Sequence, residues 1–153
     1  MDTKDVEIFT DGACRGNPGP GGYGVILRCC GREKELSQGF GSTTNNRMEL
    51  LAAVTGLSAL KEHCRVTLYS DSQYLVNGIE KGWAKKWRAN NWIKSDKKPA
   101  LNADLWGEIL RLAELHELNL VWVRGHDGHS ENERCDRLAV EAALNAADTD
   151  TVG

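Results

Sequence analysis

The chain has little of what marks a secreted, membrane-bound or disulfide-stabilised protein. Its five cysteines are odd in number and show no C-x-x-C spacing, so they indicate neither a disulfide framework nor a zinc knuckle. No apolar run approaches the ~18 residues of a membrane span, and the start of the chain lacks the basic and apolar regions of a signal peptide. We therefore expect a cytoplasmic protein with reduced thiols and no membrane partner.

A large excess of positive charge is also missing. Lys and Arg number 19 against 22 Asp and Glu, which gives a formal net charge of −3. This balance argues against a broad positive surface but leaves room for a local one. The 153 residues, 41% of them hydrophobic, fit one globular domain with a real core. We expect a single, monomeric domain over residues 1–153, with a basic protrusion at about 80–101 and a frayed tail at about 148–153.

The pattern of apolar residues predicts a mixed α/β fold. The first forty residues read as three short antiparallel strands, and the rest alternates helices with parallel strands. The expected strands are 6–11, 22–30, 34–40, 66–70 and 118–124, and the expected helices are 44–63, 72–79, one beginning after Asn102 and one beginning at Ser130. The result is a five-stranded mixed sheet with helices on its faces. Cys29 and Cys30, adjacent in the second strand, are expected to face opposite ways.

Four carboxylates occupy positions that a solvated surface acid would not normally take. Asp11 and Asp71 each end an apolar strand, and Glu49 and Asp136 each lie in the first turns of an apolar helix. Taken singly, each acid is more often a turn residue or a complement to the helix dipole. Together they can meet at one sheet edge, where packed acids resist ionising unless cations neutralise them. The pattern therefore favours a magnesium site, and such sites most often act on phosphates.

Two polar segments flank this expected site. Residues 19–24 match G-x-G-x-x-G, but a strand follows instead of a helix, so a hairpin turn is favoured over a dinucleotide site. Gly12 lets the backbone approach a ligand closely, and Asn17 can donate and accept hydrogen bonds. The segment 43–47 predicts a helix cap, and its N–H groups and amides can also contact sugar hydroxyls and base edges. Both interpretations can hold at once.

The segment from Lys81 to Lys98 is basic and rich in tryptophan. It holds seven basic residues, one acid and three of the five tryptophans. A charge run is often only a solvated face, and Trp83 and Trp87, four residues apart, can be a buried helical stripe. Basic residues interleaved with large aromatics on an acidic chain favour contact with nucleic acid, through phosphates and through stacking or sugar packing.

The loop at residues 125–130 holds His126 and His129. An H-x-x-H spacing can bind zinc, but no cysteine pair or H-E-x-x-H motif accompanies it, so zinc is not expected. A histidine on a glycine-flanked loop beside a carboxylate cluster can move protons, because its pKa lies near neutrality. From spacing alone, that role and the role of an ordinary exposed loop residue are equally supported.

Taken together, these segments resemble bacterial type-1 ribonuclease H. The resemblance runs from about Val6 to about Ala147 and implies a ribonuclease H-like fold. It also implies endonucleolytic cleavage of the RNA strand of RNA–DNA hybrids, which leaves 5′-phosphate and 3′-hydroxyl ends. The segments that carry it are Ile8-Phe9-Thr10-Asp11-Gly12, Gly16-Asn17-Pro18-Gly19-Pro20-Gly21-Gly22-Tyr23-Gly24, Thr43-Thr44-Asn45-Asn46-Arg47-Met48-Glu49-Leu50, Asp71-Ser72-Gln73-Tyr74, Val123-Arg124-Gly125-His126 and Asn132-Glu133-Arg134-Cys135-Asp136.

The resemblance also implies roles for individual residues. The family's metal-binding and catalytic carboxylates fall on Asp11, Glu49, Asp71 and Asp136, and its mobile-loop histidine falls on His126. The residues that line the minor groove and read 2′-hydroxyls fall on Gly12, Cys14, Asn17, Asn46 and Gln73. A pocket for a DNA-strand phosphate falls on Thr44, with Arg28 and Asn17 expected near it. The protrusion that holds the DNA strand carries Trp83, Lys85, Lys86, Trp87 and Arg88.

The implied cofactor is a pair of Mg²⁺ ions bound together with substrate and bridged by Asp11, with Mn²⁺ as an alternative metal. Asp127 departs from the small or neutral residue expected beside His126. No N-terminal hybrid-binding module is visible, so grip on the substrate would rely on the protrusion. The rival interpretations are a transposase- or resolvase-like nuclease acting on DNA and a non-catalytic hybrid-binding module. The four intact acids and the Asn and Gln residues of the groove favour cleavage of hybrids.

Overall fold

The protein, a computed structural model, is described at residues 3–124 and 130–152, with side chains described through residue 147. The strands are β1 Lys4–Cys14, β2 Gly19–Cys29, β3 Arg32–Thr43, β4 Cys64–Ser70 and β5 Glu117–Trp122. The helices within the described ranges are α1 Asn45–Ser58, α2 Gln73–Glu80, α3 Trp83–Ala89, α4 Ala103–Glu114 and α5 Ser130–Val152. None of these helices combines the length and apolar composition needed to cross a membrane.

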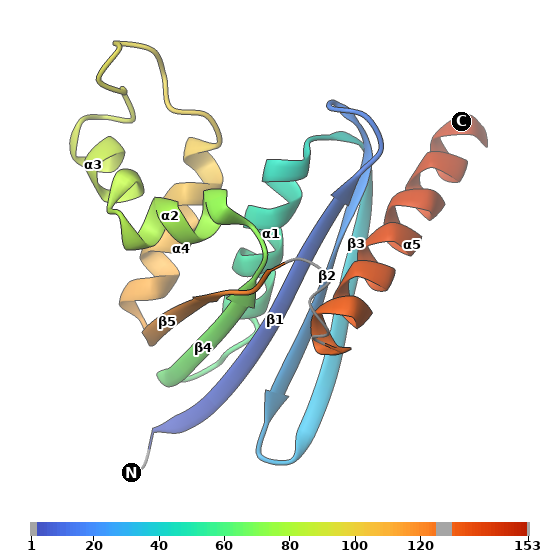
Figure 1. Cartoon of the computed structure of the whole chain (residues 1–153), viewed down its shortest axis with the longest axis horizontal. Helices are drawn as coiled ribbons and strands as arrows, with labels where there is room; N and C mark the ends of the chain where they lie inside the picture. The colour runs from blue at the N-terminus through green and yellow to red at the C-terminus, as the bar shows by residue number, and fades with distance from the viewer. Residues whose placement is uncertain (1–2, 125–129, 153) are drawn as a thin grey trace.

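The strands form one mixed sheet in the order β3-β2-β1-β4-β5. β1 pairs antiparallel with β2 and parallel with β4, and β4 pairs parallel with β5. In Figure 1, α5 covers one face of this sheet, and α1 and α4 lie on the other. The predicted fold class is therefore confirmed, including the change from antiparallel to parallel pairing at β1.

The elements differ from the predicted ones mainly in their ends. β1 runs three residues beyond Asp11 because its residues up to Cys14 keep pairing with β2. α1 ends at Ser58, five residues earlier than the apolar spacing predicts, and Ala59 caps it with bonds to two preceding carbonyls. The basic segment contains the short helix α3, which its weak periodicity does not predict.

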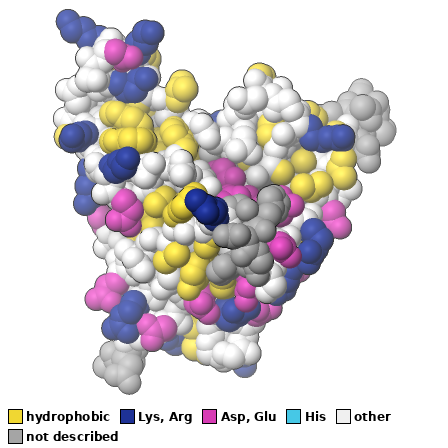
Figure 2. Space-filling model, in the orientation of Figure 1, with side chains coloured by type: hydrophobic (Ala, Val, Ile, Leu, Met, Phe, Trp, Pro, Cys, Tyr) yellow, Lys and Arg dark blue, Asp and Glu magenta, His cyan; other side chains and the backbone are white. Residues whose placement is uncertain are grey.

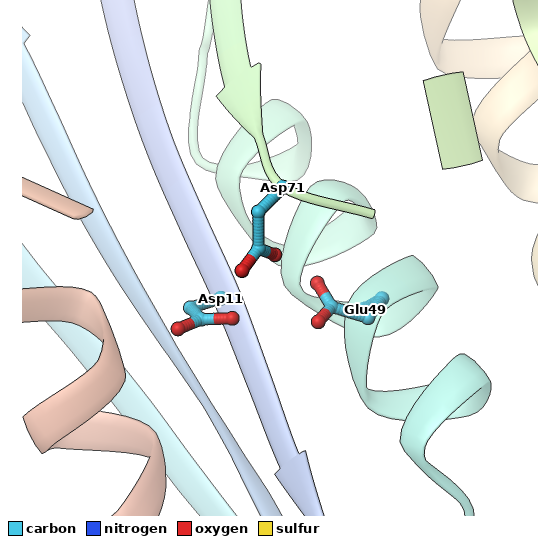
Figure 3. A group of neighbouring side chains, drawn as sticks. All are labelled: Asp11, Glu49 and Asp71. Carbon is cyan, nitrogen blue, oxygen red and sulfur yellow. The ribbon is translucent and has the colours of Figure 1, made fainter. Parts of the chain in front are cut away.

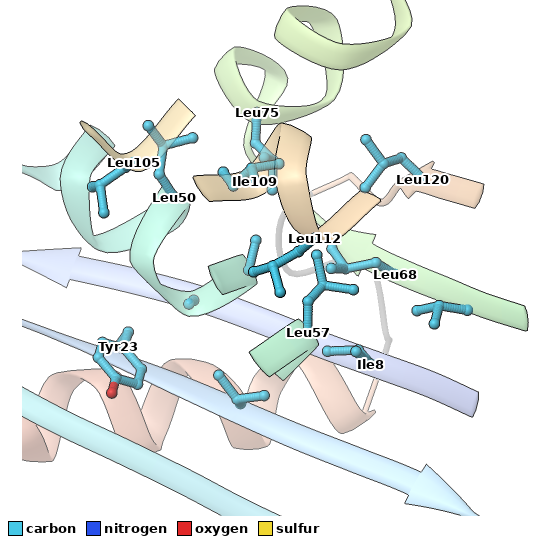
Figure 4. Close-up of a cluster of buried hydrophobic side chains, with 14 of the residues drawn as sticks. Ile8, Tyr23, Leu50, Leu57, Leu68, Leu75, Leu105, Ile109, Leu112 and Leu120 are labelled. Atoms are coloured by element: carbon cyan, nitrogen blue, oxygen red, sulfur yellow. The ribbon is translucent and has the colours of Figure 1, made fainter. Parts of the chain in front are cut away.

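The larger hydrophobic core lies between the sheet and the layer of α1 and α4. Figure 4 shows Ile8 and Leu68 from the strands facing Leu57 and Leu112 from these helices. All four side chains are buried, so the core fixes α1 against β1 and β4. Burying side chains of this kind contributes about 1.5–3 kcal/mol each.

α5 packs on the opposite face of the sheet over a smaller cluster of Phe9, Ile26 and Cys135. Glycines on the sheet allow this close approach. A Cβ atom added at Gly24 would collide with the carbonyl oxygen of Cys135, and one added at Gly39 would collide with the carbonyl oxygen of Ala142. The sheet thus accepts the α5 backbone directly, which brings the start of α5 close to the middle of β1.

Candidate active site

The site begins where β1 parts from β4. Their parallel pairing ends at Phe9 and Tyr69, two residues before Asp11, while β1 continues against β2 with Asp11 opposite Gly24. Asp71 follows the last residue of β4 directly. The sequence predicts that Asp11 ends its strand, but Asp11 lies inside β1. It still marks the point where the parallel pairing with β4 has ended. Both acids consequently emerge at the same edge of the parallel half of the sheet.

Glu49 reaches this edge from α1. Thr44 caps the helix, and its hydroxyl accepts a hydrogen bond from the Arg47 N–H at 3.2 Å. The backbone of β1 touches the first turn at Gly12, where an added Cβ atom would lie 2.7 Å from the Glu49 nitrogen and 2.8 Å from the Met48 carbonyl carbon. Gly12, expected to let the backbone approach a ligand, thus lets β1 approach α1. This contact carries the Glu49 side chain to Asp11.

The three side chains point toward one another, as Figure 3 shows. One carboxylate oxygen from each of Asp11, Glu49 and Asp71 lies within 4.8 Å of the other two. Asp11 and Glu49 are buried and Asp71 is half-buried. The Oε2 atom of Glu49 is buried without a hydrogen-bond partner. A buried carboxylate oxygen is normally satisfied, so an unpartnered one among other acids indicates room for a cation.

The electrostatics of the cluster support the same conclusion. Burial, with smaller contributions from the negative charges of Asp71 and Asp136, raises the pKa of Asp11 to about 8. A hydrogen bond of 2.9 Å from the Gly12 N–H to Asp11 Oδ1 opposes this rise. Burial and the neighbouring Asp11 and Asp71 likewise raise the pKa of Glu49. The acids therefore resist ionising together until positive charge enters the site.

Asp136 borders this group from α5. It is not among the three acids whose oxygens lie within 4.8 Å, but its side chain interacts with that of Asp11 and contributes to the raised pKa there. Two contacts hold the start of α5 against β1. The Asn132 amide donates to the Thr10 carbonyl at 3.4 Å, and the Cys135 thiol donates to the Phe9 carbonyl at 3.3 Å. These positioning contacts are not predicted from the sequence, where the two residues stand out only as part of a motif.

The donor set fits a hard divalent cation. Each of the four acids offers carboxylate oxygens, the ligands that Mg²⁺ and Mn²⁺ prefer, and no sulfur or imidazole of the described residues joins the group. A bound cation would favour the ionised form of Asp11, whose pKa is raised, and would also give the unpartnered Glu49 oxygen a partner.

Comparisons with known proteins decide which family has this arrangement. The family model described as RNase H matches residues 3–144. The chain belongs to the ribonuclease H family. It is 64% identical over 140 residues to the ribonuclease H of Desulforamulus reducens, which covers 92% of this chain and 88% of the relative. It is 57% identical over 148 residues to that of Proteus mirabilis, covering 97% and 92% of the two chains. The protein is accordingly a metal-dependent ribonuclease H that cleaves RNA in RNA–DNA hybrids.

Solved ribonuclease H structures show the same fold. LC9-RNase H1, a type 1 RNase H with the type 2 active-site motif, superposes with a TM-score of 0.84 at 31% identity, covering 95% of this chain and 75% of that one. LC11-RNase H1 in complex with an RNA/DNA hybrid superposes with a TM-score of 0.70 at 27% identity, covering 92% and 98%.

The ribonuclease H residues expected to line the groove lie around the acidic cluster. Asn46 and Gln73 are exposed near the starts of α1 and α2, close in the chain to Glu49 and Asp71. The Asn17 side-chain oxygen accepts a hydrogen bond of 3.4 Å from the Asn45 N–H, which ties the loop after β1 to the start of α1. The exposed amide of Asn46 thus precedes Glu49 by three residues, and that of Gln73 follows Asp71 by two.

The Cys14 thiol, expected beside those amides, donates to the carbonyls of Gly19 and Thr43 at 3.5 and 3.3 Å. Thr44 follows Thr43 directly and caps α1, so it lies at the same end of the sheet. Cys14 therefore links β1, β2 and β3 close to the expected phosphate pocket.

The expected place of Arg28 near Thr44 is wrong. Gly19 at the start of β2 pairs with Thr43, whereas Arg28 lies nine residues further along the strand and pairs with Glu33. Nine strand residues span about 30 Å. The Arg28 guanidinium instead bonds Glu33 at 2.6 Å and Glu131 at 3.2 Å. Arg28 lies near the turn between β2 and β3, as the expected strands 22–30 and 34–40 imply, and there it links the sheet to α5.

The protrusion contains both an anchor and an exposed surface. Trp87 is half-buried and packs edge-on against Trp106 of the core, with ring centroids 6.2 Å apart, so it anchors the protrusion, and its place in the binding surface stays a prediction. Trp83 is exposed, and the Lys81 ammonium lies 5.6 Å from its ring centroid. Arg88, expected to contact substrate, pairs with Glu114 at 3.0 Å.

Lys85 and Lys86 are exposed on α3. Figure 2 shows one group of basic side chains on the upper left lobe, with others elsewhere, and acidic side chains near the centre. His126, the expected catalytic histidine, lies outside the described residues together with Asp127 and His129.

Proposed function

We propose that this ribonuclease H cuts the RNA strand with two divalent ions held by Asp11, Glu49, Asp71 and Asp136, and leaves 5′-phosphate and 3′-hydroxyl ends. The convergence of three carboxylates around an unpartnered Glu49 oxygen is the observation that carries this proposal. Such ions, when bound, supply Lewis-acid activation of water and neutralise charge that develops on the leaving oxygen. We propose Mg²⁺ as the cofactor because the ligands are all carboxylates.

The residues of the chain have separate tasks in this proposal. Asp11, the most central acid, gives up its proton when the cations arrive, because their charge reverses the effect of its acidic neighbours. Asn46, Gln73 and Asn17 offer donors and acceptors to the 2′-hydroxyls of the RNA strand. His126, as an expectation from the family, assists proton transfer or product departure.

Specificity for a hybrid requires the second strand to be read as well. Thr44 caps α1 and would hold a DNA-strand phosphate, because N–H groups at a helix start favour anions. Trp83 and the lysines of α3 present an exposed aromatic ring with positive charge, which suits packing against a sugar and a backbone.

A cleavage assay tests the proposal. End-labelled RNA–DNA hybrid, duplex DNA and duplex RNA are incubated with the protein and Mg²⁺, and the ends of the products are mapped. We expect cuts only in the RNA of the hybrid, and a loss of about a hundredfold or more in kcat for Asp11→Asn with the fold intact. Asp5→Asn, at an exposed acid of the same strand, should cleave normally.

Retained turnover in Asp11→Asn would refute the metal-binding role. Cleavage of duplex DNA at a comparable rate would favour the DNA nuclease, and binding without cleavage would favour the non-catalytic module.

A further inference from the structure

The turn between β2 and β3 has an unusual residue at its first position. Cys29 is the last paired residue of β2 and faces Arg32, so Cys30 and Gly31 form a two-residue loop. Both have positive φ, 58° and 76°, as in a type I′ turn. Asn, Asp or Gly normally fills the first position, because a side chain in the left-handed region costs about 1–2 kcal/mol. A cysteine there requires an explanation.

The turn brings two thiols together. Adjacent residues of a strand point to opposite faces, as expected for Cys29 and Cys30 from the sequence, but the left-handed backbone of Cys30 reverses this. The two sulfur atoms lie 2.8 Å apart, and both thiols are free. Cys30 is exposed and Cys29 is half-buried, so an external ligand can reach both.

The surroundings of the pair add two further groups. The Lys4 ammonium, paired with Glu62 at 2.7 Å, interacts electrostatically with both thiols. Cys64 is buried and interacts electrostatically with each of them. The hydrogen bond between the Cys29 and Cys30 thiols, together with burial, raises the pKa of Cys29 to about 11, so this thiol keeps its proton at neutral pH.

We propose that Cys29 and Cys30 form a dithiol site that chelates a soft, thiophilic centre of the trivalent arsenical class. Thiolates select soft centres, and the hard Mg²⁺ of the active site does not compete for them. The number of available ligands distinguishes among soft centres. A structural zinc takes four protein ligands, whereas this turn supplies two thiols. An organic trivalent arsenical already carries one carbon ligand, so two adjacent thiols complete its coordination.

The binding step is a condensation without a redox change. An arsenoxide, R–As=O, reacts with the two thiols to give R–As(S–Cys)₂ and one molecule of water. Two As–S bonds form, the two S–H protons leave with the oxygen, and arsenic stays trivalent. Two bonds to one chain make the adduct resistant to single thiols, which must break both in succession, while a competing dithiol removes it.

Intact-mass analysis of the full chain tests the proposal. The reduced protein is treated with one equivalent of phenylarsine oxide, and excess glutathione is then added. We expect one adduct that survives glutathione and is removed by 2,3-dimercaptopropanol. Cys29→Ser and Cys30→Asn should lose this retention, whereas Cys14→Ser should keep it.

Cys30→Asn is the decisive variant because Asn suits the left-handed position and preserves the turn. Its unfolding midpoint should equal or exceed that of the native chain, which separates loss of the site from loss of the fold. A glutathione-resistant adduct in Cys30→Asn would overturn the proposal, as would its absence from the native chain.

This site is independent of hybrid cleavage. Cys29 lies five residues along β2 from Gly24, the partner of Asp11, which is about 17 Å of strand. In Figure 1 the turn is at the lower end of the molecule, away from the basic protrusion at the top. We therefore expect unchanged cleavage kinetics when the dithiol is occupied. A negative result in the arsenical experiment therefore does not contradict the metal-site proposal. A negative result in the cleavage assay likewise does not contradict the dithiol proposal.

Discussion

Asp11 gives the metal-free protein an unusual dependence of stability on pH. Its pKa is about 8 in the folded state against an ordinary 3.8. The unfolded chain therefore loses this proton near pH 4 while the folded protein holds it, so stability is full at low pH and falls as pH rises toward 8. We expect the free energy of unfolding in chelator, measured with urea, to be lower at about pH 8 than at about pH 5.

This decline in the free energy of unfolding should be smaller in Asp11→Asn, because the amide does not ionise. It should also be smaller in the native chain when Mg²⁺ is present, because the cation favours the ionised acid. Asp5→Asn, at an exposed position of the same strand, should keep the native dependence. An equal decline in the native chain and Asp11→Asn would show that the Asp11 carboxylate is already charged in the folded protein.

At the scale of elements, the start of α5 depends on ties to the sheet. Arg28 reaches Glu131 and Glu33 and also lies 5.2 Å from the centroid of the Phe9 ring. We expect Arg28→Gln to lower the hydrogen-exchange protection of the first turns of α5 several-fold. Because Asp136 then loses its fixed position, we also expect kcat to fall by a larger factor than KM rises. Mass-spectrometric exchange of the hybrid-free protein measures the first effect.

Arg65→Gln is the matched control. Arg65 makes two ion pairs, with Asp5 at 2.9 Å and Glu117 at 3.1 Å, but these join strands of the sheet and leave α5 untouched. It should leave the protection of α5 and the kinetics unchanged. Equal effects of the two substitutions would mean that Arg28 acts as an ordinary surface charge.

The order and type of the elements are predictable from this chain, because alternating and helical spacing of apolar residues reports directly on which face is buried. Their ends are less predictable. β1 extends to Cys14 only because β2 offers a partner, and that partner is distant in the sequence. The convergence of the acids at one edge follows from a strand, helix, strand connection, whereas the contact between Gly12 and the first turn of α1 does not.

Two of the errors concern arginine and cysteine side chains at one end of a hairpin. Arg28 is misplaced because its expected place near Thr44 came with the resemblance, although the expected strands 22–30 and 34–40 put it near their turn. The opposite orientation predicted for Cys29 and Cys30 is also wrong. The expected strand 22–30 includes Cys30, whereas Cys30 is the first residue of the turn, a position that Asn or Gly usually occupies. The conformation of this turn is thus the local feature that the sequence pattern predicts least well.

At the scale of the whole molecule, positive charge is concentrated on the protrusion although the chain is acidic overall. Lys85→Gln with Lys86→Gln should raise KM for the hybrid and reduce the slope of log KM against log salt by about 1–2, since each phosphate contact contributes about one unit. Arg88 is left unchanged because it pairs with Glu114. Initial rates at several salt concentrations measure the slope.

The control is Lys61→Gln, at an exposed lysine between α1 and β4. It removes positive charge away from the protrusion and should leave the slope as it is. A slope that changes equally for both lysine substitutions would attribute the salt effect to net charge and not to the protrusion.

β1 carries the central acid and is also the strand that everything else is built on. It pairs with β2 along one edge and β4 along the other, and α1 and α5 pack on its opposite faces. Separating β1 from α1, β4 or the start of α5 would separate the carboxylates that these elements carry, so a form opened in this way should lack activity. Activity should be lost at the same temperature or denaturant concentration at which the domain unfolds. Loss of activity and unfolding should therefore form one cooperative transition.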